Sequence, residues 1–223
     1  QDSPSPHHSQ ASTRLAWLAW GTAAAFFFYA WILRVSPSVL VNELMAELAV
    51  SGAIVGHLSA MYFYGYAGMQ IPVGMLLDRY GPRRLVTAAA ILCTAGGILF
   101  ALGDDVQTLS GARLMIGAGA AFSLLGAVYI GQQWLPLRYF AFLGGTAMMF
   151  GMLGGVVGQG PVRVAIEAFG WRETLLAVAG AGAALALMAW LTIRDKPRLP
   201  GESRSPLSGL AEVLKERQNW LVA

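Results

Sequence analysis

The chain has 223 residues, of which 56% are hydrophobic and only 12% are charged, and its mean hydropathy is +0.56. Soluble domains average about 25% charged residues, so this composition excludes a water-soluble fold and predicts an integral membrane protein. The net charge of +3 does not indicate a nucleic-acid partner, because the basic residues fall between apolar runs and form no single stripe.

Residues 1–14 are polar, and such a segment buries too little apolar surface to fold, so we expect a disordered cytoplasmic tail. Six apolar runs follow, each long enough to cross a hydrocarbon core of about 30 Å as a helix. β-barrel strands would alternate in polarity, whereas these runs are apolar on all sides. The sequence therefore predicts an all-α, six-helix transmembrane bundle over residues 15–193. The runs lie near 16–41, 54–77, 85–103, 107–135, 139–163 and 173–193.

The basic residues predict the orientation of the bundle. Eight Lys and Arg residues lie in the connections on one side of the predicted spans, and only Arg163 and Arg172 lie on the other. Basic connections stay in the cytoplasm, so we expect both termini to be cytoplasmic, in a bacterial inner membrane. The eight are Arg14, Arg79, Arg83, Arg84, Arg138, Arg194, Lys196 and Arg198.

Residues 194–223 follow the last predicted span. A Pro- and Arg-rich linker over 194–206 leads to apolar residues at helical spacing, which indicates a short amphipathic helix on the cytoplasmic surface. The chain ends on Trp220-Leu221-Val222-Ala223. Two interpretations stay open: a seventh span begins here, or Trp220 anchors the surface helix at the lipid headgroups.

The connection between the second and third spans carries a distinctive pattern, Gly74-Met75-Leu76-Leu77-Asp78-Arg79-Tyr80-Gly81-Pro82-Arg83-Arg84. It resembles the signature loop of the major facilitator superfamily, Gly-x-Leu-x-Asp-Arg-x-Gly-Arg-Lys, with proline in place of the first base. The resemblance implies half of a facilitator fold and a loop that holds the two halves together and takes part in gating. The residues to which this role is carried over are Gly74, Asp78, Arg79, Gly81 and Arg83.

The start of the fourth span gives a second resemblance to the same family. Leu109 to Ala121 follow the pattern Leu-x-x-x-Arg-x-x-Gln-Gly-x-Gly-Ala-Ala, except that Ile116 replaces the glutamine. The arginine of that pattern is associated with proton coupling in several members, which implies this role for Arg113. The alternative is that Arg113 extends to the membrane interface.

A short internal repeat supports two three-helix units of inverted topology within the bundle. Asp78-Arg79-Tyr80-Gly81-Pro82-Arg83 aligns with Glu167-Ala168-Phe169-Gly170-Trp171-Arg172, matching acid, aromatic, glycine and arginine. One segment is predicted inside and the other outside, as two three-helix repeats of inverted topology require. The repeat predicts that spans 1–3 superpose on spans 4–6. Separately, Gly151, Gly154, Gly155 and Gly158 predict a close helix-packing face on the fifth span.

Arg34 is the clearest candidate for a substrate contact. An ionisable residue within a span costs at least about 2.5–3.5 kcal/mol and therefore needs a reason. Fifteen or more apolar residues precede it, and Ser36-Pro37-Ser38 can bend the helix or free a carbonyl. We expect Arg34 to face a central cavity and pair with an anionic solute. Similar first-span arginines occur in members of the superfamily that carry organic or phosphorylated anions. Alternatively, Arg34 lies in the outer third of the membrane or pairs with a structural partner.

Polar side chains on the first, second and fourth spans complete the predicted binding set. In the superfamily, spans one and four line the cavity and span two flanks it, so these groups are expected to orient the solute. Each of them has an alternative role in helix packing. The set is Tyr29, Tyr62, Tyr66, Tyr129 and Gln133.

Nothing in the sequence indicates an enzyme, a metal site or a cofactor, because it lacks a phosphate-binding Gly-Lys-Ser/Thr loop and metal-spaced Cys/His sets. We expect the N-terminal half of a secondary transporter that moves a small organic anion by alternating access, with protons as the coupling ion. Such a bundle needs a second six-helix half, which the rest of a longer chain or another copy would supply. The alternative is a half-size membrane scaffold without transport.

Overall fold

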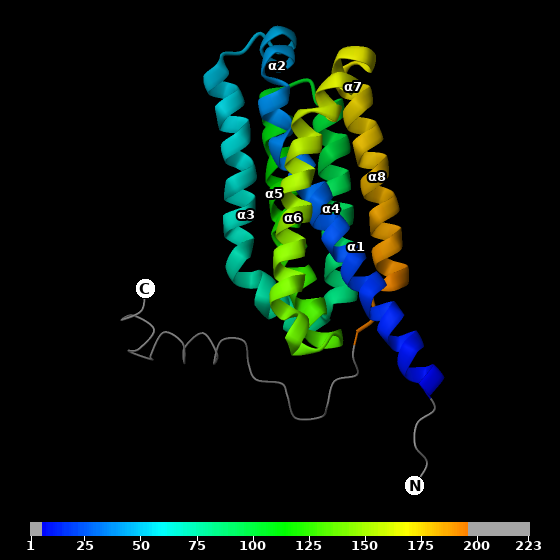
Figure 1. The fold of residues 1–223 in the computed structure, drawn as a ribbon. Coiled ribbons are helices and arrows are strands. Elements are labelled where there is room, and N and C mark those ends of the chain that lie inside the picture. The colour runs from blue at the N-terminus through cyan, green and yellow to red at the C-terminus, as the bar shows by residue number, and fades with distance from the viewer. Residues whose placement is uncertain (1–5, 196–223) are drawn as a thin grey trace.

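The computed structural model describes residues 6–195, and over this range every regular element is a helix (Figure 1). Eight α-helices and one 3-10 turn follow one another through short connections. They are α1 (Pro6–Val39), α2 (Val41–Glu47), α3 (Gly52–Tyr80), α4 (Pro82–Leu102), α5 (Val106–Trp134), η1 (Leu137–Tyr139), α6 (Phe140–Gln159), α7 (Pro161–Phe169) and α8 (Trp171–Thr192).

The helices confirm the predicted all-α membrane bundle. Five stretches of the described chain are long and apolar enough to cross a bilayer, and α6 with α7 forms one of them, Leu137–Phe169. A sixth is reached when α2 and α3, which meet at an angle of 117°, are counted as one broken span. The long helices run side by side, with α2 and α7 at one end and the N-terminus at the other (Figure 1). We call these the α2 end and the signature-loop end, because the α3–α4 connection lies at the latter.

The start of the first helix differs from the prediction, and the C-terminal elements cannot be compared. Helix α1 begins at Pro6, so residues 6–14, expected within a disordered tail, form its first turns. Proline fits the first turn of a helix, and no glycine interrupts the chain before Gly21, so the helix continues outward from the apolar span. The predicted linker beyond Asp195, the amphipathic helix and the final Trp220–Ala223 segment lie outside the described residues.

Glycines set the closest helix contacts. A Cβ on Gly65 of α3 would overlap the backbone carbonyl of Leu114 in α5, and one on Gly154 of α6 would overlap that of Phe28 in α1. Small residues let backbones approach in this way. The predicted glycine face of the fifth span is confirmed, because Gly151, Gly154, Gly155 and Gly158 all face α1.

These two glycine contacts are related by the internal repeat. Gly154 lies 89 positions after Gly65, the same offset that separates Gly170 from Gly81. Gly81 has φ 81° and ψ 157°, and Gly170 has φ 91° and ψ 157°, so each occupies a backbone region that favours glycine. Each ends one helix and starts the next. The chain therefore turns in the same way at opposite ends of the bundle.

Candidate functional site

Arg113 is buried inside the bundle and has no ion pair within residues 6–195. Its side chain is 1% exposed, and its guanidinium donates from Nη1 to the backbone carbonyl of Leu33 at 2.7 Å and from Nη2 to that of Arg34 at 3.3 Å. The guanidinium carbon also lies 5.0 Å from the ring centroid of Tyr62. The alternative in which Arg113 reaches the membrane interface is therefore wrong, and its role in coupling stays a prediction.

Pro37 explains why a carbonyl is available there. Proline has no backbone N–H, so the carbonyl of Leu33, four residues earlier in α1, loses its helical donor. In an apolar surrounding an unpaired carbonyl is costly. Arg113 and the Ser36 hydroxyl, which donates to the same oxygen at 2.9 Å, supply the missing hydrogen bonds.

Arg34 is half-buried where α1 meets α3, and its side chain is held by aromatic rings. Its guanidinium carbon lies 4.6 Å from the ring centroid of Trp31 and 5.1 Å from that of Phe63. None of the ion pairs within residues 6–195 involves Arg34. Arg34 precedes Val39, the last residue of α1, by five residues, or about 7–8 Å. Its side-chain contacts are aromatic, and its pairing with a solute stays a prediction.

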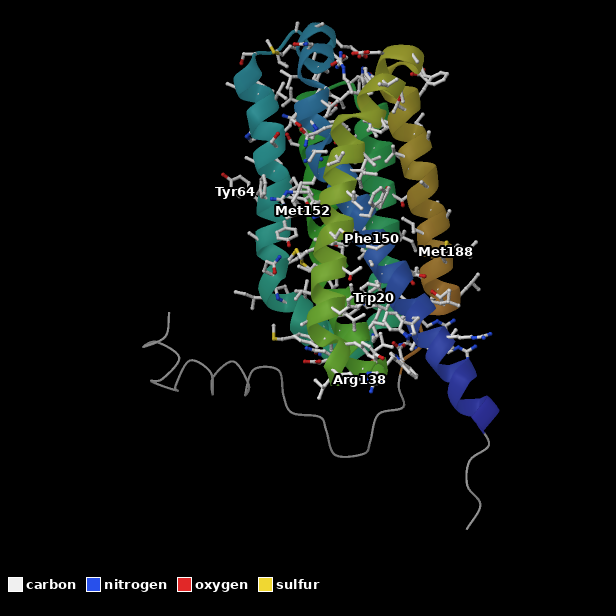
Figure 2. All side chains as sticks on the ribbon, in the orientation of Figure 1. Trp20, Tyr64, Arg138, Phe150, Met152 and Met188 are labelled. Atoms are coloured by element: carbon white, nitrogen blue, oxygen red, sulfur yellow. The ribbon has the colours of Figure 1, made fainter. Side chains whose placement is uncertain are left out.

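Tyr62 and Tyr66 extend this aromatic surface along α3. Their rings stack with centroids 6.0 Å apart and an interplanar angle of 16°, and Tyr62 is buried whereas Tyr66 is partly exposed. Tyr64, between them in sequence, points away from the bundle (Figure 2). We call the set at this level the arginine–aromatic cluster: Trp31, Arg34, Tyr62, Phe63, Tyr66 and Arg113.

The other predicted binding residues lie elsewhere. Tyr29 is buried between α1, α4 and α8, where a Cβ on Gly182 would overlap the Tyr29 hydroxyl. Tyr129 and Gln133, both partly buried, follow Arg113 in α5 by 16 and 20 residues, which is about 24 and 30 Å along the helix. A small solute at Arg34 therefore cannot touch them at the same time. The predicted set is divided between three places in the bundle.

The signature loop packs against the end of α8. The Arg83 backbone N–H donates to Asp195 Oδ1 at 2.9 Å, and its Nε donates to the Trp190 carbonyl at 3.0 Å. A Cβ on Gly81 would collide with the Asp195 carboxylate, in addition to its positive φ. By contrast, a Cβ on Gly74 meets nothing within 4 Å in the described part of the chain.

The acid and the first arginine of the loop pattern, Asp78 and Arg79, are exposed. Asp78 and Arg79 lie at the end of α3, and the guanidinium carbon of Arg79 is 5.3 Å from the ring centroid of Tyr80. Arg138, on η1, lies at the same end of the bundle (Figure 2). Arg138 and the arginines of the signature loop thus lie at one end of the bundle.

A polar network at the α2 end was missed from the sequence. Arg163 of α7 donates to Glu43 of α2 at 2.8 Å and to the Val39 carbonyl at 2.9 Å. Arg172 of α8 donates to Glu47 of α2 at 2.7 Å. Its hydrogen bonds hold the pKa of the Glu47 carboxyl below its usual value. The helical spacing of Glu43 and Glu47 was the one available sign, since residues four apart share a helix face.

Over the described residues, five apolar spans with a sixth, broken one, an internal inverted repeat and a glycine-bearing loop between the second and third spans define half of a two-bundle carrier. A family model described as Major Facilitator Superfamily matches residues 18–223, so the chain belongs to this superfamily.

Comparisons with individual proteins agree. The chain is 25% identical over 177 residues to the probable sulfoacetate transporter SauU of Cupriavidus necator, covering 79% of this chain and 41% of that protein. It is 26% identical over 204 residues to the inner membrane transport protein YajR of Escherichia coli, covering 88% of this chain and 43% of that protein. A bacterial homolog of the human lysosomal transporter Spinster, solved in an inward-facing and occupied conformation, superposes with a TM-score of 0.73 at 20% identity, covering 92% and 48%. The chain thus spans less than half the length of these relatives.

Proposed function

We propose that this chain is the N-terminal half of a secondary transporter that moves a small organic anion by alternating access. The observation that carries the proposal is the Arg34 guanidinium, which is partly exposed where α1 meets α3 and has no carboxylate partner within residues 6–195. A charge in a span costs free energy unless it serves a partner. An anionic solute would be that partner.

The aromatic contacts of Arg34 support an anion in particular. Trp31 and Phe63 lie against the guanidinium but accept none of its N–H hydrogen bonds, so its donors stay available. Arginine binds carboxylates and other oxyanions through two such donors at once. The name of the similar SauU protein points to sulfoacetate, a small organic anion, which agrees with this class of solute.

The solute would bind between this bundle and a second six-helix half, since the relatives are more than twice as long as the matched region. We place the signature-loop end in the cytoplasm of a bacterial inner membrane, because that end carries the basic connections. We propose the proton as the coupling ion and Arg113 as the residue that takes part in coupling.

The test uses the full-length protein in liposomes with small carboxylates, sulfonates and phosphate monoesters as solutes. We expect Arg34→Ala to weaken binding of the transported anion by about 10- to 150-fold, because a charged hydrogen bond contributes about 1.5–3 kcal/mol. Arg14→Ala is the matched control, since Arg14 is exposed on the same helix and lies 20 residues away.

The outcomes separate the alternatives. Transport that Arg34→Ala leaves unchanged would refute Arg34 as the anion contact. A well-folded full-length protein that binds and moves none of these solutes would favour the membrane scaffold. Loss of transport in Arg14→Ala as well as in Arg34→Ala would show that the effect comes from any lost charge on α1.

A further inference from the structure

Arg83 and Arg172 make equivalent hydrogen bonds at opposite ends of the bundle. Arg83, at the start of α4, donates to the carbonyl of Trp190 near the end of α8 at 3.0 Å. Arg172, at the start of α8, donates to the carbonyl of Ala101 near the end of α4 at 2.7 Å. Arg172 follows Arg83 by 89 positions, and Trp190 follows Ala101 by 89 positions. The two hydrogen bonds are therefore counterparts in the two repeats.

The surroundings of the two arginines are also similar, although their tryptophans do not occupy equivalent positions of the repeat. Each follows a glycine of positive φ, and each guanidinium lies over a tryptophan ring, with Arg83 at 4.2 Å from Trp190 and Arg172 at 4.5 Å from Trp171. The last carbonyls of a helix have no helical donor and carry its negative dipole end. In both repeats an arginine at the start of one helix thus donates a hydrogen bond to a carbonyl near the C-terminal end of the helix packed beside it.

Each arginine also meets carboxylates that lie outside its own helix. At the signature-loop end, the backbone N–H of Arg83 donates to Asp195, just after α8. At the α2 end, the Arg172 guanidinium binds Glu47 of α2 at 2.7 Å and Asp104 of the α4–α5 connection at 2.8 Å. We call Arg83, Trp190 and Asp195 the loop latch, and Glu47, Ala101, Asp104 and Arg172 the α2 latch.

We propose that the α2 latch is the counterpart of the signature loop at the opposite membrane face, and that Arg172 and Glu47 are positioning residues for the transport cycle. Alternating access needs each half to rock as one body. The α2 latch joins the ends of α2, α4 and α8, and the loop latch joins α4 to α8 at the other end. Together they hold the α4–α8 pair at both faces. This inference rests on the proposed transport by alternating access.

The α2 latch acts mainly by position, because its ion pairs add little stability. Exposed ion pairs contribute about 0–1 kcal/mol, and the side chains of Glu47 and Asp104 are 41% and 86% exposed. What distinguishes Arg172 is that one planar guanidinium binds three elements at once, which fixes their relative positions. Arg163 adds a further connection, from α7 to Glu43 and to the end of α1.

Hydrogen exchange of the full-length protein in lipid nanodiscs tests the proposal and needs no solute. We expect Arg172→Gln to speed exchange about five-fold or more in residues 41–47 and 101–105, while residues 78–84 and 188–195 stay unchanged. Arg83→Gln should speed exchange in residues 78–84 and 188–195 and leave residues 41–47 and 101–105 unchanged. If Arg172→Gln fails to fold, Glu47→Gln removes only the ion pair between Arg172 and α2, and it should speed exchange in residues 41–47 alone.

The matched controls are Glu173→Gln and Arg84→Gln, because each is an exposed neighbour of a latch arginine and has no ion pair in the described chain. In uptake assays we expect Arg172→Gln to lower Vmax and to leave KM within about two-fold, since the arginine–aromatic cluster is intact. Faster exchange at both ends, or at neither, would overturn the proposal. Transport failure of the wild-type protein would instead refute the proposed function and leave the exchange result standing.

Discussion

The Arg113 guanidinium donates a hydrogen bond of 2.7 Å to the backbone carbonyl of Leu33, from α5 to α1. The carbonyl is open because Pro37 lies one helical turn later in α1. Two residues 76 positions apart, Pro37 and Arg113, thus form one structural unit. The arginine of the family pattern supplies the hydrogen bond that Pro37 removes from the first span. A substitution at either residue should therefore change the contribution of the other to stability.

A double-mutant cycle tests this unit. Pro37→Ala restores the N–H that the Leu33 carbonyl lacks, so Arg113→Met should cost less free energy of unfolding in the Pro37→Ala background. We expect the difference to be about 1–3 kcal/mol, the penalty for leaving one buried polar group unpaired. Chemical unfolding of the four proteins in detergent measures it. Equal costs in both backgrounds would show that Arg113 does not compensate for Pro37.

The glycine contact between α1 and α6 gives a second prediction. A Cβ on Gly154 would overlap the Phe28 carbonyl, whereas one on Gly144 of the same helix meets nothing within 4 Å. We expect Gly154→Ala to lower the free energy of unfolding by about 1–3 kcal/mol, because the two backbones must move apart. Gly144→Ala should leave it unchanged or raise it, since alanine is the better helix former. Thermal unfolding in one detergent compares the pair, and equal melting temperatures would refute the contact.

Depth along the bundle predicts that Arg34 and Gln133 act independently. The backbone of Arg34 is bonded to Arg113, and Gln133 lies about 30 Å further along α5. Changes this far apart add in free energy to within about 0.5 kcal/mol. We therefore expect Arg34→Lys and Gln133→Leu to have additive effects on solute affinity. Isothermal titration of the two single variants and the double variant checks this, and a larger coupling would place both residues in one site.

Local patterns in the sequence predicted much of this fold. The apolar runs gave five of the spans to within a few residues, and the glycines of the fifth span predicted its packing face, because span length and small-residue spacing depend on neighbours in the same helix. Gly81 was singled out by its loop pattern, and its φ of 81° gives the physical reason. These features need no knowledge of what lies across the bundle.

The site itself depended on contacts between distant parts of the chain. Arg113 binds a carbonyl 80 positions away, and Arg172 binds Glu47 from 125 positions away. No periodicity reports such pairs. Tyr29 and Tyr62 were similar in the sequence, since each is a tyrosine within an apolar run. One faces α4 and α8 and the other faces Arg113, and only the packing of the helices distinguishes them.

The pH dependence of stability gives a last prediction, at the α2 end. Hydrogen bonds from Arg172 and then from Trp171 lower the pKa of Glu47 from its ordinary value of 4.5. A carboxylate with a lowered pKa in the folded state contributes stability that is present above its unfolded pKa and lost as the pH falls through the folded one. We therefore expect Glu47 to cause no loss of stability between pH 7 and about pH 5, and a loss of stability at lower pH.

Comparing melting temperatures of the wild type and Glu47→Gln from pH 7 to below pH 5 isolates the effect of Glu47. The difference between the two proteins should be constant above about pH 5 and shrink below it, because protonation of Glu47 removes what the variant already lacks. Equal melting temperatures of the two proteins at pH 7 would mean that the hydrogen bonds from Arg172 and Trp171 to Glu47 contribute nothing to stability.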